Sequence, residues 1–213
     1  MLPFPSHFQS KKHFRYLFQK GTSAIAQEKL LVALHGYGQL IPYFAKKFEG
    51  LEEHTSLLFP EGMHRFYLNG TSGRVGASWM TREDRLIDIE DNLGWLTELL
   101  DYIKSQHNFK EITLLGFSQG GATAARLYFK QPSYFQRLIM WASVFPPDIE
   151  KMDKDVSNGI FIVGNKDPYF TDELESTCEF YRSNKYEVMR FSGSHDIHFP
   201  TLKSLYNEKQ KNK

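Results

Sequence analysis

The sequence predicts an α/β fold in which helices cover both faces of a mostly parallel central sheet. Short apolar runs rich in β-forming residues alternate with longer segments of helical periodicity, which is typical of parallel sheets. A serine between two glycines, in Gly116-Phe117-Ser118-Gln119-Gly120, joins one such apolar run to a helix of small residues. No Pro/Ser-rich linker or charge block divides the 213 residues, so we expect one domain spanning residues 1–213.

Seven short apolar runs are predicted as strands, because each is rich in β-forming residues and lies between segments with turn signals or helical periodicity. They are residues 14–18, 30–34, 56–59, 111–116, 137–141, 159–163 and 186–191. Functional residues are then expected at the carboxyl ends of these strands, where the sites of open α/β sheets form.

Four longer segments are predicted as helices. In residues 82–104, apolar side chains recur every three or four positions, and Thr81 is placed to cap the start. This stripe is expected to be core, and it consists of Leu86, Ile89, Leu93, Leu96, Leu100 and Ile103. The helix at 119–130 starts with glycines and alanines, which permit close approach to the sheet. Helices are also expected at 172–183 and 200–209, and residues 208–213 as a solvated tail.

Residues 60–80 are predicted to form a long irregular loop. Four glycines lie in it, at positions 62, 70, 73 and 76, together with Arg65, Arg74 and Trp79. Long loops inside a compact domain are usually functional, although the sequence leaves the role of this one open.

The composition is that of an ordinary globular protein, with 41% hydrophobic and 24% charged residues. The net charge of +1 and the lack of a dense Lys/Arg face give no basis for binding nucleic acid. No apolar run is long enough for a membrane span, so we expect a cytoplasmic protein without integral membrane association. The single cysteine, Cys178, cannot form an intrachain disulfide, and no Cys/His spacing indicates a metal or another cofactor.

The Gly-Phe-Ser-Gln-Gly segment is predicted to be a nucleophile elbow, the sharp turn between a strand and a helix that exposes a reactive serine. Side chains larger than hydrogen beside Ser118 would collide with the neighbouring strand or helix, which explains the two glycines. The alternative is an ordinary turn between a strand and a helix, since glycine and serine are common there.

A serine needs a base to accept its proton and a third group to orient that base. Only two histidines follow Ser118, and both lie just beyond the strand at 186–191. His195 is the favoured base, because it lies in a flexible turn directly after that strand. His198 precedes the next helix and is interpreted as a surface or capping residue.

Asp167 is the favoured acid because it follows the apolar strand at 159–163, at the carboxyl end of the sheet. Asp172 is the runner-up, although its surroundings favour a helix N-terminus. Asp196 adjoins His195 in sequence and would point elsewhere. His195 and His198 lie three residues apart, but a metal chelated by them would lack a carboxylate or cysteine ligand at suitable spacing.

The oxyanion formed during acyl transfer needs fixed hydrogen-bond donors. One is expected to be the backbone amide of Gln119, next to the serine. The other is expected from His35-Gly36-Tyr37-Gly38, which follows the strand at 30–34, and most simply from the amide of Tyr37. The alternatives are a plain glycine-rich turn or a phosphate loop, and the latter lacks its Gly-Lys-Ser/Thr ending.

Four segments together resemble the phospholipase/carboxylesterase family of α/β-hydrolases, which includes small bacterial carboxylesterases and acyl-protein thioesterases. They are His35-Gly36-Tyr37-Gly38, Gly116-Phe117-Ser118-Gln119-Gly120-Gly121, Gly164-Asn165-Lys166-Asp167 and Gly193-Ser194-His195-Asp196-Ile197. The resemblance implies an α/β-hydrolase fold and a triad of Ser118, Asp167 and His195. The sequence departs from the family at Met80, where an aromatic residue is common, and at Tyr169, where a small aliphatic is usual.

The leading hypothesis is a cofactor-free serine hydrolase without a large cap domain, acting on esters or thioesters of small, short- to medium-chain acyl groups. The resemblance implies that Trp79 lines the acyl site. We expect an apolar wall there from Tyr37, Trp79, Met80, Phe145 and Phe170. The alternatives are a hydrolase-like binding module that has lost turnover, or a peptidase of the same fold. The expected partner is a small molecule, and the sequence leaves open whether the protein is a homodimer.

Overall fold

The computed structural model describes residues 5–149 and 158–207. Within them, seven strands form one sheet in the order β1-β3-β2-β6-β7-β8-β9. Only the edge strand β1 (Tyr16–Gln19) is antiparallel to its neighbour, β3 (Ser56–Pro60). The remaining pairs are parallel, as predicted. They involve β2 (Lys29–Leu34), β6 (Glu111–Phe117), β7 (Arg137–Trp141), β8 (Gly159–Gly164) and β9 (Glu187–Phe191).

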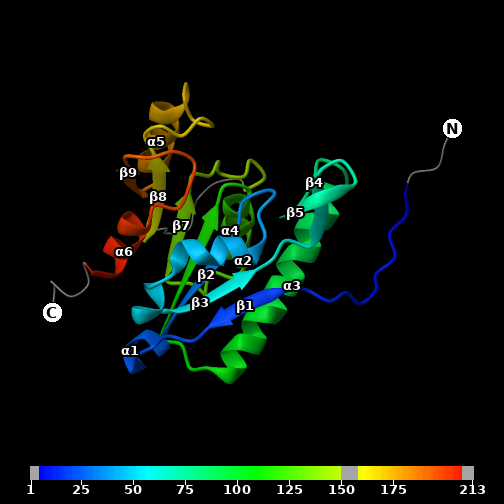
Figure 1. The fold of residues 1–213 in the computed structure, drawn as a ribbon, viewed down its shortest axis with the longest axis horizontal. Coiled ribbons are helices and arrows are strands. Elements are labelled where there is room, and N and C mark those ends of the chain that lie inside the picture. The colour runs from blue at the N-terminus through cyan, green and yellow to red at the C-terminus, as the bar shows by residue number, and fades with distance from the viewer. Residues whose placement is uncertain (1–4, 150–157, 208–213) are drawn as a thin grey trace.

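The central strands are almost wholly buried because both faces of the sheet are covered. Figure 1 shows α2 (Ile41–Phe44) in front of the sheet in that view and α4 (Gln119–Lys130) behind it. Helix α4 packs against β6, β7, β2 and the long helix α3 (Arg85–Gln106). The other helical segments are α1 (Ala24–Gln27), η1 (Ala45–Phe48), η2 (Leu51–Glu53), α5 (Leu174–Ser183) and α6 (Phe199–Asn207).

The predicted loop at 60–80 is wrong for most of its length, because it contains an antiparallel hairpin. Strand β4 (His64–Asn69) pairs with β5 (Ser72–Ser78), and the pairing of Asn69 with Ser72 leaves a two-residue turn. Gly70 occupies that turn with a φ of 62°, which glycine adopts without strain. A glycine at the first position of a two-residue turn is a hairpin signal, so Gly70 marks a turn and not an irregular loop.

The hairpin lies beside the first half of α3, as Figure 1 shows. The His64 imidazole of β4 is 3.0 Å from a carboxylate oxygen of Asp88 in α3. This arrangement corrects two details of the predicted helix. Thr81 does not cap it, since its hydroxyl donates to the Glu83 carbonyl and α3 starts only at Arg85. Leu86 is 68% exposed because the first turn of α3 extends beyond the core that buries most of the remaining stripe.

The other predicted elements agree with the structure to within a few residues. Helix α5 begins two residues after the predicted start at 172, and α6 starts at Phe199. The two four-residue helices α1 and α2 were not predicted, because so few residues show no periodicity. The predicted tail at 208–213 lies outside the described residues.

Candidate active site

Ser118 lies in a strained turn between the end of β6 and the start of α4, as the sequence predicts. Its φ of 52° and ψ of −121° are rare for a residue with a side chain. A Cβ atom on Gly116 would overlap the backbone of Gly120 and Gly121, and one on Gly120 would overlap the carbonyl of Leu34. The glycines are therefore required by the close approach of α4 to β6 and β2.

Asp167 and His195 form a hydrogen-bonded pair. The Nδ1 atom of His195 lies 2.7 Å from Oδ2 of Asp167, whose side chain is completely buried. The other carboxylate oxygen accepts the backbone N–H of Tyr169 at 3.0 Å. With Nδ1 donating to the carboxylate, Nε2 of the neutral imidazole is left as a proton acceptor.

The imidazole of His195 contacts two aromatic rings. Phe117, the residue immediately before Ser118, has its ring centroid 4.9 Å away, and Tyr169 has its centroid 4.5 Å away. The contact with Phe117 places the histidine against the turn that carries the serine. The structure thus brings the predicted acid and base together and packs the base against Phe117, the residue before the predicted nucleophile.

The rival histidine and acids have other partners or positions. His198 precedes α6, where its Nδ1 lies 2.8 Å from the Thr201 hydroxyl and its carbonyl accepts the Leu202 N–H. Asp196 forms an ion pair with Lys47, at 2.6 Å. Asp172 lies in an exposed turn before α5. His198 lies at the start of α6, and because its side chain contacts a hydroxyl and not a backbone N–H, a capping role stays a prediction.

The glycine turn after β2 lies against Ser118. A Cβ atom built on Gly36 would be 3.1 Å from the Cβ of Ser118, so the backbone of this turn borders the nucleophile. The Tyr37 side chain is 59% exposed and packs against Phe66 of the hairpin. Gln119 begins α4, where helix geometry leaves its N–H without an intrahelical acceptor. Both predicted oxyanion donors therefore lie close to Ser118 in the fold.

The side chain of Gln119 makes contacts that the sequence did not indicate. Its Oε1 accepts from the Ser78 hydroxyl and from the Trp79 N–H, both at 3.1 Å, and its Nε2 donates to the Met80 carbonyl at 2.9 Å. The residue after the nucleophile is thereby fixed to the end of the hairpin. In the sequence, only the expectation that Trp79 lines the acyl site indicated that residues 78–80 lie near Ser118.

Two of the residues expected to form an apolar wall are instead in the hydrophobic core. Trp79 is fully buried, and its indole N–H donates to the His35 carbonyl at 2.8 Å. Phe170 is buried against Phe161. Trp79 and Phe170 were expected to form an accessible wall of the acyl site. This expectation is wrong, because both rings pack beneath the surface.

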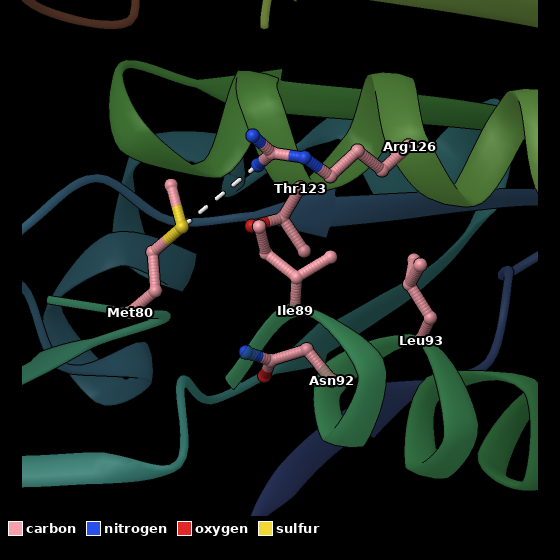
Figure 2. A pocket seen from close by; sticks show the side chains of 6 residues that line it. All are labelled: Met80, Ile89, Asn92, Leu93, Thr123 and Arg126. Atoms are coloured by element: carbon pink, nitrogen blue, oxygen red, sulfur yellow. Dashed lines mark hydrogen bonds between the residues drawn. The ribbon is translucent and has the colours of Figure 1, made fainter. Parts of the chain in front are cut away.

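Met80 and Phe145 line hollows, and their role in binding stays a prediction. Met80 borders a hollow too narrow to hold a water molecule, between α3 and α4. Figure 2 shows Met80 pointing toward Arg126, whose Nη1 lies 3.9 Å from the Met80 sulfur. Phe145 borders a separate hollow of about 220 Å³ beside α5.

Buried charge near the first hollow is paired. Arg126 is almost fully buried and binds Asp148 through two hydrogen bonds, of 2.8 and 2.5 Å. The hydrogen bonds from Arg126 lower the pKa of Asp148 below its ordinary value. Within residues 5–149 and 158–207, no cluster of three His, Cys, Asp or Glu side chains could hold a metal ion. No helix in this part of the chain is long and apolar enough to cross a membrane.

Comparisons with known proteins give a family and a fold. A family model described as "Serine hydrolase (FSH1)" matches residues 24–208. No curated protein matches the sequence. Among solved structures, the carboxylesterase of Bacillus cereus is similar with a TM-score of 0.67 and 19% identity, over 93% of this chain and 94% of that one.

Two further solved structures show the same similarity. The carboxylesterase of Mesorhizobium loti has a TM-score of 0.70 and 16% identity, over 92% of this chain and 94% of that one. Acyl-protein thioesterase 2 of Zea mays has a TM-score of 0.67 and 14% identity, over 94% of this chain and 99% of that one. At these identities the likeness establishes the fold, which is the predicted α/β-hydrolase fold.

Proposed function

Because the chain belongs to the serine hydrolase family FSH1, we propose that it cleaves small carboxylic esters or thioesters through an acyl-enzyme formed on Ser118. The observation that carries the proposal is the buried Asp167 carboxylate bonded to His195, whose ring packs against Phe117, the residue before a serine in a strained turn. Such a serine, base and acid constitute the groups that acyl transfer requires. The names of the similar carboxylesterases and of the thioesterase support the choice of ester and thioester substrates.

In this mechanism the Ser118 oxygen attacks the acyl carbonyl while Nε2 of His195 accepts the hydroxyl proton. Asp167 holds the imidazole through Nδ1 and stabilises the imidazolium as it forms. The backbone amides of Tyr37 and Gln119 donate to the oxyanion, and each contributes roughly 3 kcal/mol to stabilising the transition state.

The alcohol or thiol then leaves with the proton that His195 returns to it. Water attacks the acyl-enzyme next, with His195 accepting its proton, and the released carboxylic acid restores Ser118. All proton transfers use the chain's own residues, and no cofactor takes part. We propose a small-molecule partner and a cytoplasmic location, as expected from the sequence.

The test is turnover combined with active-site labelling. Wild-type protein should hydrolyse p-nitrophenyl acetate and butyrate with an initial burst, and should react covalently with a fluorophosphonate probe. Ser118→Ala should abolish both signals. Ser105→Ala, which removes an exposed hydroxyl on α3, is the matched control and should behave as wild type.

A series of p-nitrophenyl esters with acyl chains of increasing length, and the corresponding thioesters, then defines the substrate class. We expect short- to medium-chain esters to give the highest kcat/KM. Wild-type protein that neither turns over these substrates nor takes the label would refute the proposal, as would a label that survives Ser118→Ala.

A further inference from the structure

His35, the first residue after β2, is a buried histidine with a defined protonation state. Its side chain is inaccessible to solvent, and Nδ1 lies 2.7 Å from the carbonyl oxygen of Gly36. Its Nε2 accepts the backbone N–H of Gly62 at 2.9 Å. A carbonyl can only accept and an N–H can only donate, so the imidazole is neutral with its proton on Nδ1. Burial lowers its pKa to about 4, which favours the same neutral form.

The Gly36 carbonyl, which sets the direction of the next amide, accepts the short bond from His35 and a longer one of 3.3 Å from the Gln39 N–H. The carbonyl of Gly36 and the N–H of Tyr37 belong to one planar peptide, in which they point in opposite directions. By holding that carbonyl toward the interior, His35 turns the Tyr37 N–H away from itself. The same peptide borders the nucleophile, since a Cβ on Gly36 would be 3.1 Å from the Cβ of Ser118.

The amides on either side of Tyr37 are already occupied. The Gly36 N–H donates to the side-chain oxygen of Gln39 at 2.9 Å, and the Gly38 N–H donates to the Ala77 carbonyl at 2.8 Å. The Tyr37 N–H donates to no other described residue. It is therefore the amide of this turn that is open to a ligand.

We propose that His35 is a positioning residue for the oxyanion hole: its Nδ1–H orients the Gly36–Tyr37 peptide so that the Tyr37 N–H faces the developing oxyanion. The inference rests on the proposed hydrolase function, and adds to it a side chain that never touches the substrate. His35 differs from a purely structural histidine in acting on the turnover step through one defined hydrogen bond.

Two substitutions separate its two hydrogen bonds. His35→Asn can place an N–H where Nδ1 lies and loses the acceptor for Gly62, whereas His35→Gln can keep that acceptor and loses the donor to Gly36. We expect His35→Gln to lower kcat about 10- to 100-fold with little change in KM, and His35→Asn to stay within about threefold of wild type. Affinity for a trifluoromethyl ketone, which forms an anionic adduct with the serine, should fall in parallel with kcat.

A second pair of variants tests the amide without altering the buried histidine. Tyr37→Pro removes the N–H, and Tyr37→Ala keeps it and serves as the control. Tyr37→Pro should lower kcat by about 10²-fold or more relative to Tyr37→Ala, which shares the loss of the side chain. If His35 acts through this amide, His35→Gln should have little further effect in the Tyr37→Pro background.

The outcomes distinguish this inference from the function on which it rests. An active wild type that loses activity in Ser118→Ala, but shows equal kcat losses in His35→Asn and His35→Gln, would overturn the role of His35 alone. Additive effects of His35→Gln and Tyr37→Pro would do the same. An inactive and unlabelled wild type would overturn both the function and the inference. Thermal unfolding of each variant establishes that it is folded at the assay temperature.

Discussion

Gly121, near the start of α4, faces Ser143 so closely that a methyl group on Gly121 would overlap the Ser143 side chain. Ser143 follows β7, and its carbonyl accepts the hydroxyl of Tyr181 from α5 at 2.9 Å. Helix α4 can therefore sit tightly behind the serine turn only because position 121 lacks a side chain.

Gly121→Ala should destabilise the protein by about 1–3 kcal/mol, since the added methyl forces α4 or the Ser143 segment to move. Gly94→Ala is the matched control. Gly94 is exposed in α3 with nothing near its missing Cβ, so alanine there should stabilise by about 0.5–1 kcal/mol. Urea unfolding measures both changes. Adding Ser143→Gly should recover part of the loss, and a Gly121→Ala protein as stable as wild type would contradict the packing described.

Replacing Asp167 should disable the base without removing it. In Asp167→Asn, the amide N–H₂ can face Nδ1 of His195 and favour the tautomer with the proton on Nε2, which cannot accept the serine proton. We expect kcat to fall about 10⁴-fold. Asp172→Asn, in the exposed turn before α5, should leave kcat unchanged. Equal losses in the two variants would show that Asp167 is not the orienting acid.

Stability should depend on pH through His35. The unfolded chain binds a proton at this residue below pH 6.5, whereas the folded protein does so only near its pKa of about 4. The contribution of the neutral His35 side chain to the free energy of unfolding is therefore complete above pH 6.5. It is lost as the pH falls toward 4. The shift corresponds to roughly 3 kcal/mol in the free energy of unfolding.

Urea unfolding between pH 7 and 4 checks this effect, with His35→Asn as the reference that lacks the titrating group. Other groups contribute to the pH dependence of both proteins, so the difference between their slopes isolates His35. Parallel slopes in the wild type and the variant would exclude the histidine as the source.

Asp148 should be needed mainly because Arg126 is buried. Asp148→Asn leaves a guanidinium that is 6% exposed without its charged partner, and we expect a loss of about 1–3 kcal/mol in the free energy of unfolding. Adding Arg126→Met should restore much of that loss. Glu175→Gln, which breaks the exposed pair with Arg190, should have a much smaller effect. Similar losses in the two single variants would contradict this assignment.

The sheet was predictable because its parallel strands are buried on both faces and appear as continuous apolar runs. The strands at 30–34 and 137–141 illustrate this. The pairing of His195 with Asp167 was also predictable, because each residue follows a predicted strand and strands of this fold end at one edge. Periodicity located α3, but the exposure of Leu86 depends on where the core ends, which a repeat does not reveal.

The remaining features depend on contacts between segments far apart in sequence. The β4–β5 hairpin was missed because four glycines in residues 60–80 favoured an irregular loop, whereas Gly70 in fact begins a two-residue turn. The bonds from Gln119 to residues 78–80, and from His35 to Gly62, join segments that only the folded chain brings together. Buried polar side chains of this kind carry no periodic signal.

The order of the strands also determines when the chain becomes chemically competent during its synthesis. The turn after β2 and the serine after β6 emerge from the ribosome first, and they lie on adjacent strands of the sheet. His195 follows β9, at the far side of β7 and β8, and is the last of the proposed reacting groups to be made. Under the proposed mechanism, a nascent chain that already contains Ser118 therefore has no base to activate it until the residues after β9 have been made.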